Sequence, residues 1–114
     1  MDAVGGDGHE PPSGSFQVVD EVGGPVLHLS GDVDAPLVQR MSRAGVDERD
    51  LVAVHVAGLQ FIDSTALSML VRWAQSAAGA GRPAVIRHPT PRFRQVLELT
   101  GLSPLFVLED PGAP

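Results

Sequence analysis

The chain has 114 residues, 43% of them hydrophobic, which is enough for one folded domain with a core and leaves little for a second domain. Its net charge is −6 and its basic residues are not clustered, so direct binding to nucleic acid is not expected. The absence of cysteine excludes disulfides, thiolate metal sites and cysteine nucleophiles.

The two ends of the chain differ in composition from its middle. Residues 1–15 and 110–114 are rich in glycine, proline and acidic residues, and we expect both to be disordered tails around a domain at residues 16–109. The first residues lack the basic and apolar regions of a secretory signal. No apolar run approaches the roughly 20 residues of a membrane-spanning helix. We therefore expect a cytoplasmic protein without membrane contact.

In the first half of the domain, two short β-prone runs at residues 16–21 and 26–30 flank Gly-Gly-Pro at 23–25, which predicts a hairpin. Asp34 is a suitable N-cap for a short helix, because its side chain can accept a hydrogen bond from the first helical turn. The apolar stripe expected on this helix consists of Leu37, Val38 and Met41.

In the second half, the nearly continuous apolar run at 51–56 predicts a buried central strand, and a loop is expected at 57–62. From 65 to 78 the apolar period becomes helical. The residues expected on the buried face of this helix are Leu67, Leu70, Val71, Ala74, Ala77 and Ala78. The remaining predicted elements are a strand at 83–87, a turn at 89–91, a helix ending at Thr100 and a strand at 106–108.

This order, β-β-α-β-α-β-α-β, predicts an α/β fold. We expect a mixed sheet of four or five strands with helices packed mainly on one face and right-handed parallel crossovers in the later part.

The most informative segment, residues 58–70, joins the predicted central strand to the most amphipathic helix. Asp63, Ser64 and Thr65 stand where that helix must begin. The N–H groups of a first helical turn lack partners within the helix, so one reading is that Asp63 or Ser64 is simply an N-cap worth about 1 kcal/mol.

Three motifs, in order, resemble those of one family. FIDSTAL at 61–67 is similar to the signature of STAS domains, specifically the bacterial anti-sigma factor antagonists. SGDVD at 30–34 resembles the turn after the family's second strand, and LTGL at 99–102 followed by LF at 105–106 resembles its C-terminal segment. The resemblance covers about residues 16–109. Ala66 stands where the family usually has glycine, and His55 where the strand often has aspartate.

The resemblance implies a STAS-like fold and a switch. In that family the serine that follows the motif's aspartate, here Ser64, is phosphorylated by an anti-sigma factor that is also a kinase. The unphosphorylated antagonist binds this partner and frees the sigma factor for transcription, and a phosphatase resets the switch. Asp63 would hold the helix start, while Asp32 and Asp34 would line the partner surface.

Several residues have two readings. Met69 and Trp73 flank the predicted buried stripe, either as a packing pair or as apolar contacts for the partner. Thr65 is a second phosphoacceptor or a polar residue that contacts the partner or solvent. Arg92 and Arg94 are either solvated or paired with acidic residues of a partner. The sequence also leaves open homodimer formation and a different class of function, a STAS scaffold or transporter-associated subunit that is never phosphorylated.

No catalytic or metal-binding pattern stands out. The four histidines have no ligand-like spacing, and we expect them to be structural or on the surface. Ser64 is not within a Gly-x-Ser-x-Gly elbow, and no phosphate-binding glycine loop follows a strand. We therefore expect a protein that is not an enzyme and needs no metal or other cofactor.

Overall fold

The computed structural model describes residues 14–110, which form one sheet with helices against it. The strands are β1 (Gly14–Glu21), β2 (Gly24–Val33), β3 (Ala53–Ile62), β4 (Val85–Arg87) and β5 (Val107–Glu109). The helices are α2 (Ala35–Arg43), α3 (Ser64–Gly79) and α4 (Pro91–Leu99), with short 3-10 helices η1 (Glu48–Asp50) and η2 (Ser103–Leu105). The predicted order of strands and helices is confirmed.

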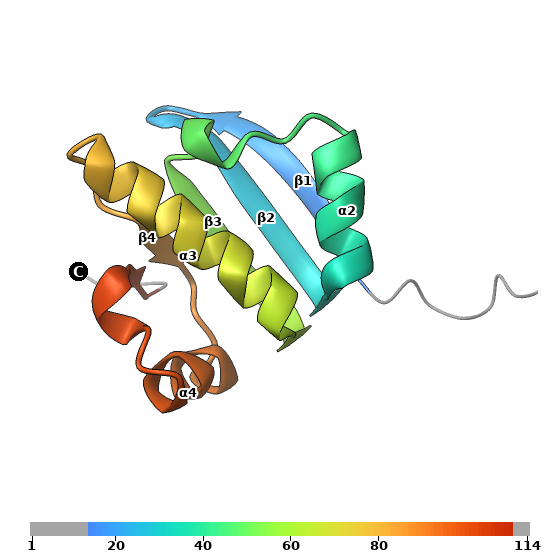
Figure 1. Ribbon diagram of the computed structural model, residues 1–114, viewed down its shortest axis with the longest axis vertical. Helices are drawn as coiled ribbons and strands as arrows, with labels where there is room; N and C mark the ends of the chain where they lie inside the picture. The colour runs from blue at the N-terminus through green and yellow to red at the C-terminus, as the bar shows by residue number, and fades with distance from the viewer. Residues whose placement is uncertain (1–13, 111–114) are drawn as a thin grey trace, which may run out of the picture.

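The sheet is mixed and its strands lie in chain order (Figure 1). β1 and β2 form the antiparallel hairpin, and each later strand pairs in parallel with the one before it. Parallel neighbours need a crossover connection, and here each crossover contains a helix. The predicted mixed sheet of four or five strands is therefore confirmed, with five.

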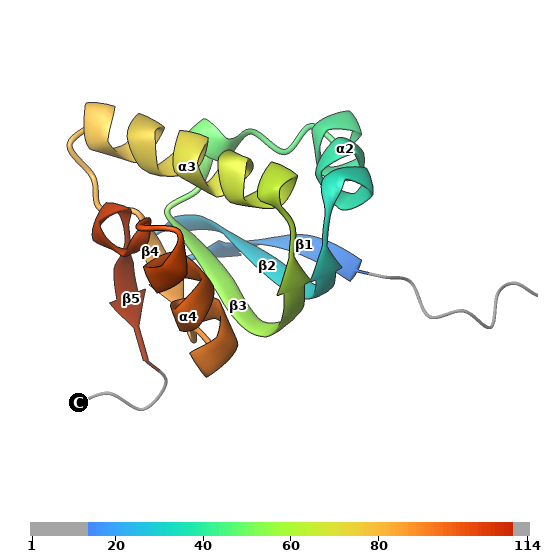
Figure 2. The ribbon, with the colours of Figure 1, turned by 60° about the horizontal axis from the view of Figure 1, so that its bottom comes forward.

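All three α-helices lie on the same side of the sheet (Figure 2). Side chains alternate between the faces of a strand, and the core side of β2 and β3 carries residues such as Leu27, Leu29, Val54 and Val56, which are 0–1% exposed. The helices cover them with side chains that include Leu37, Leu70, Trp73, Phe93 and Leu97. The opposite face of the sheet has no helix against it in the described part of the chain, as Figure 2 shows. No described helix has the length and apolarity needed to cross a bilayer.

The loop predicted at residues 57–62 is wrong, because β3 continues through it to Ile62. This stretch pairs with the second half of β2, after register shifts between His28 and Ser30 and between Gly31 and Asp32. At each shift β3 has one residue more than β2, and this extra residue breaks the alternation of inward and outward side chains that marks a strand in the sequence. The long pairing carries both strands to the same edge of the sheet.

The predicted buried face of α3 is also partly wrong. Leu70, Ala74 and Ala77 are buried as expected, whereas Leu67 and Val71 are only partly covered and Ala78 is exposed. The buried face instead includes Ala66, Met69 and Trp73. The helix is thus rotated so that its largest side chain enters the core and two aliphatic residues stay near the surface.

The N-terminal boundary of the domain lies slightly earlier than expected. Gly14 and Ser15, placed in the predicted tail, belong to β1 and pair with Gly31 and Ser30. Asp110, the first residue of the predicted C-terminal tail, is described and pairs with Arg94, while residues 1–13 and 111–114 of the two predicted tails lie outside the described residues.

Candidate functional site

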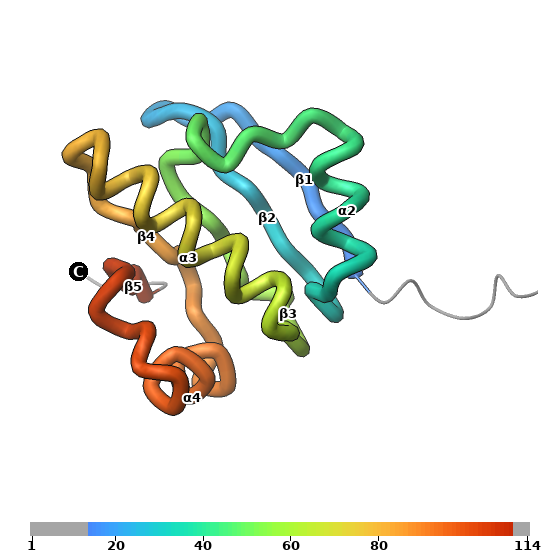
Figure 3. The backbone as a smooth tube through the Cα atoms, in the orientation of Figure 1, coloured from blue at the N-terminus to red at the C-terminus, as the bar shows by residue number. Residues whose placement is uncertain are grey.

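Two parallel strands end side by side, and a helix begins at each end (Figure 3). Val33 at the end of β2 pairs with Ile62 at the end of β3, and the N–H of Asp63 donates to the carbonyl of Val33 at 3.1 Å. The first turns of α2 and α3 therefore lie at one edge of the sheet. Helix N-termini carry partial positive charge and free N–H groups, so this edge favours an anion.

Asp63 joins the two helix starts. Its Oδ1 accepts a hydrogen bond from the N–H of Ala66 at 2.9 Å, which caps α3 as predicted. Its Oδ2 accepts one from the N–H of Ala35, the first residue of α2, at 3.0 Å. One half-buried carboxylate thus satisfies N–H groups of two helices that are distant in the sequence.

Two more carboxylates lie at this edge. Asp34 caps α2, with its Oδ1 accepting from the N–H of Leu37 at 3.1 Å, as predicted. Asp32 is half-buried near the end of β2, where it pairs with Phe61. Together with Asp63 they place three acidic side chains at the edge where α2 and α3 start.

The hydroxyl-bearing residues of this turn face solvent. Ser64 is the first residue of α3, and both Ser64 and Thr65 are exposed. The structure thus brings together five of the predicted site residues, and a docking protein could reach Ser64.

Beside Ser64 lies an apolar hollow of about 440 Å³. Leu67 and Val71 of α3 and Leu102, next to η2, form its apolar wall, and Ser64, Ser68 and Arg72 complete the lining. The spacing of Ser64, Leu67, Ser68 and Val71 places them on one side of the helix. The candidate site therefore combines an exposed hydroxyl, three carboxylates and an apolar surface.

The predicted partner contacts at Met69 and Trp73 are wrong for this conformation. The two side chains are 6% and 1% exposed. The indole Nε1 of Trp73 donates to the carbonyl of Leu51 at 3.0 Å, and its ring lies 6.2 Å from that of Phe106. The other reading, a packing pair, is what the structure shows.

Ala66, which stands where the family usually has glycine, does not change the exposed surface of the site. Ala66 is fully buried in the core cluster, so its methyl group packs inward and leaves the outer surface of the first turn unchanged.

Leu67, Val71 and Leu102 are surface residues of the site that the sequence reasoning missed. The apolar residues of α3 cover more of the helix than its buried face, which carries Met69 and Trp73. Leu67 and Val71 lie beside that face and are only partly covered. That excess of apolar residues was the available signal, and it indicates a second, surface-facing stripe.

The two arginines with two readings in the sequence, Arg92 and Arg94, have different surroundings. Arg94 pairs with Asp110 within the chain, while Arg92 is exposed. The described residues contain no group of three or more side chains placed to hold a metal ion.

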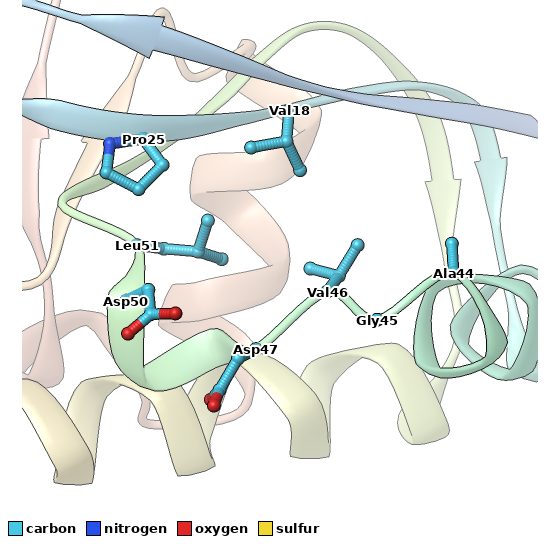
Figure 4. Close-up of a pocket in the computed structure, with 8 residues that line it drawn as sticks. All are labelled: Val18, Pro25, Ala44, Gly45, Val46, Asp47, Asp50 and Leu51. Atoms are coloured by element: carbon cyan, nitrogen blue, oxygen red, sulfur yellow. The ribbon is translucent and has the colours of Figure 1, made fainter.

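A second hollow, of about 240 Å³, lies near the start of β2 and so at the far end of the sheet from Ser64 (Figure 4). Val18, Pro25, Val46 and Leu51 supply most of its apolar wall. The carboxylate of Asp47 at its rim points away from Pro25 and Val18 in this view.

Asp47 is already bound within the chain. The side chain of Arg49 donates to its carboxylate at 2.8 and 3.1 Å, and the backbone N–H of Arg49 donates to it at 2.9 Å. These hydrogen bonds lower the pKa of Asp47 to about 2. The carboxylate of Asp47 is thus held in its ionised form and is not suited to proton transfer in the second hollow.

Comparisons with known proteins agree with this architecture. The structure is similar to the unphosphorylated anti-sigma factor antagonist SpoIIAA, with a TM-score of 0.61 and 19% identity over 82% of this chain and 87% of that one. It is also similar to the phosphorylated form of SpoIIAA, a cell fate determinant of Bacillus, with a TM-score of 0.58 and 19% identity over 82% and 90%.

An anti-sigma factor antagonist from Mycobacterium paratuberculosis gives a TM-score of 0.62 and 26% identity over 88% of both chains. A search of curated proteins found no match. The family model described as "Mlab, STAS domain" matches residues 16–108. The chain therefore belongs to the STAS domain family.

Proposed function

We propose that the protein is an anti-sigma factor antagonist controlled by phosphorylation of Ser64. It binds an anti-sigma factor with serine kinase activity through the edge of the sheet where α2 and α3 begin, and a phosphatase restores the binding form. The observation that carries this proposal is the exposed Ser64 hydroxyl, at the start of α3 and beside an apolar hollow. The similarity to anti-sigma factor antagonists supports the same function.

Phosphorylation at this position is compatible with the fold. A phosphoryl group brings about −1.5 to −2 charges at neutral pH, and the dipole and N–H groups of a helix N-terminus tolerate an anion. Because Ser64 is exposed, the group would remain in solvent in the free protein. The free domain should therefore stay folded when phosphorylated.

At an interface the same charge becomes unfavourable. A partner that covers the hollow beside Ser64 would remove water from the phosphoryl group, while Asp32, Asp34 and Asp63 already make this edge acidic. A loss of affinity between a hundredfold and a thousandfold requires only about 3 to 4 kcal/mol. One desolvated and unpaired charge is sufficient for that.

The surrounding residues have separate roles in this proposal. Asp63 positions Ser64 by fixing the start of α3, and Asp32 and Asp34 line the partner surface. Thr65 provides a second hydroxyl on the same exposed turn. Leu67 and its neighbours in the hollow supply the apolar contact that the sequence suggested for Met69 and Trp73.

Phosphorylation is tested by incubating the full chain with ATP and the anti-sigma factor kinase of the same organism, and then locating phosphate by mass spectrometry. We expect phosphate on Ser64, none on Ser64→Ala, and normal phosphorylation of Ser68→Ala. Ser68 is the matched control because it is an exposed serine one turn further along α3. Phosphate that persists in Ser64→Ala would contradict the proposal.

Binding is tested separately, by calorimetry with the same partner. We expect Ser64→Asp and Leu67→Asp to weaken binding at least about tenfold, or about 1.4 kcal/mol. Leu67 is only partly covered, so its variant should stay folded, which circular dichroism checks. Unchanged affinity in both variants would place the partner surface elsewhere.

A second candidate is a STAS scaffold or transporter-associated subunit that is never phosphorylated. The observation in its favour is that the family match is to a STAS domain as such and specifies no phosphorylation, so it fits this function as well. Absence of phosphate after incubation with the kinase, together with partner binding that Ser64→Asp leaves unchanged, would favour this function.

A further inference from the structure

Three histidines form a row on the face of the sheet opposite the helices. The rings of His28 in β2 and His55 in β3 are stacked, with centroids 4.4 Å apart and planes 20° apart. The ring of His88, directly after β4, lies 4.5 Å from that of His55 and is tilted by 56°. We call His28, His55 and His88 the histidine row.

The sheet register creates this row. His28 lies between Leu27 and Leu29, which face the core, so its own side chain points to the other face. His28 and His55 are direct partners in the parallel pairing of β2 and β3, and His55 is in turn the partner of Arg87 in β4. No helix buries the row, yet its members cover one another.

The charged groups around the row come from three strands. Glu21 in β1 pairs with Nε2 of His28 at 3.2 Å and accepts a hydrogen bond from the guanidinium of Arg87 at 2.8 Å. Arg87 also lies 3.5 Å from the carboxylate of Glu109 in β5. The carboxylates of Glu21 and Glu109 are therefore already paired with a cation or an imidazole. In the sheet, Arg87 lies between His55 on β3 and Glu109 on β5.

His88 is held in an unusual backbone conformation. Its φ is 58°, and it is the only non-glycine residue with positive φ among residues 14–110. This left-handed region is disfavoured for residues with a Cβ, and such strain persists where surrounding contacts fix it. The N–H of His88 donates to the carbonyl of Glu109 at 2.8 Å, and the ring packs on His55.

We propose that the histidine row is a pH-sensitive latch that holds the end of β4 against β3. While His55 is uncharged, its ring packs against those of His28 and His88, and this packing retains His88 in its left-handed conformation. In mild acid, protonation would place like charges about 4.5 Å apart, next to the cation of Arg87. Repulsion then separates His88 from His55, and the segment that connects β4 to α4 loosens. This inference is independent of the function proposed for Ser64.

The titration of His55 is consistent with the latch. Its pKa is lowered, first by burial and then by the nearby His28 and His88, while Glu21 opposes the shift and Arg87 adds to it. A lowered histidine pKa means that folding favours the neutral form. The resulting stabilisation is present above the ordinary pKa of about 6.5 and is lost as the pH falls through the lowered value.

β4 is the part of the sheet that such repulsion would open. β4 and β5 have only three residues each, and β4 pairs with each neighbour over three positions. Short strands with few backbone hydrogen bonds open at lower free energy than long ones. The ten-residue strands β2 and β3 would keep their pairing.

The test is NMR on the full chain between pH 8 and pH 5. Histidine ring signals give the pKa values, and amide hydrogen exchange, divided by the intrinsic rate at each pH, gives the opening of β4. We expect the pKa of His55 to lie below the ordinary histidine value of about 6.5. Opening at the amides of residues 85–88 should rise by up to about tenfold per pH unit as the pH falls below the ordinary histidine pKa of about 6.5, and should level off below the lowered pKa of His55.

Variants separate the latch from general acid effects. His55→Gln keeps a neutral polar side chain in the row, and we expect it to remove most of the rise in opening. If His55→Gln fails to fold, His88→Asn serves, because asparagine also tolerates a left-handed backbone. Equal pH dependence in wild type and in the folded variant, or a His55 pKa that is not lowered from about 6.5, would overturn the latch.

Discussion

Replacing Asp63 with alanine should destabilise the domain more than the loss of an ordinary helix cap. The variant removes the acceptor for the Ala66 N–H, which costs about 1 kcal/mol as a lost N-cap. It also removes the acceptor for the Ala35 N–H, a half-buried donor whose loss of a partner costs about 1 to 3 kcal/mol. The total is about 2 to 4 kcal/mol.

Two other variants serve as matched comparisons. Asp34→Ala removes a single cap hydrogen bond, that of the Leu37 N–H, and should cost about 1 kcal/mol. Asp63→Asn keeps one acceptor oxygen, enough to cap α3, but presents an amide group to the Ala35 N–H, so its cost should be intermediate.

The measurement is urea unfolding followed by circular dichroism, with thermal melting as a second readout. A domain of this size loses about 4 to 8 °C in Tm per kcal/mol, so Asp63→Ala should melt at least about 8 °C below wild type. If Asp63→Ala costs no more than Asp34→Ala, or if Asp63→Asn matches wild type, the double role of Asp63 is refuted.

Two further predictions concern the core and the hairpin. Trp73→Phe should cost about 1 to 3 kcal/mol in urea unfolding, because the buried carbonyl of Leu51 loses its donor; an unchanged midpoint would mean that this hydrogen bond contributes nothing. Gly24→Ala should cost about 1 to 3 kcal/mol, because Gly24 has a φ of 130° and an added Cβ would lie 2.8 Å from Cγ1 of Val52. Gly23→Ala is its control, since nothing lies within 4 Å of an added Cβ there, and equal losses in the two variants would contradict the steric argument.

The sequence was sufficient for the order of elements and for the edge of the sheet that carries the site. Hairpin glycines, cap residues and the change from strand to helix period are local signals, and Asp34 and Asp63 cap the two helices as their positions predicted. The exposure of Ser64 does not follow from capping alone, because Ala35, the first residue of the capped helix α2, is half-buried.

Features that depend on pairing between distant segments were not predictable in the same way. The extension of β3 to Ile62 requires register shifts against β2, and these leave no period in the sequence. The rotation of α3 depends on Trp73 reaching the carbonyl of Leu51, a contact 22 residues away along the chain. The histidine row likewise exists only because the strand register aligns His28 with His55.

The double attachment of Asp63 has a consequence for the function proposed for Ser64. The turn that presents Ser64 is held by a carboxylate that also grips the start of α2, 28 residues earlier in the chain. A peptide copied from residues 58–70 lacks that anchor and should be a poor mimic of the site. Under the function proposed for Ser64, a nascent or damaged chain would therefore give no response until its first and middle segments have assembled, so that function would require the intact fold.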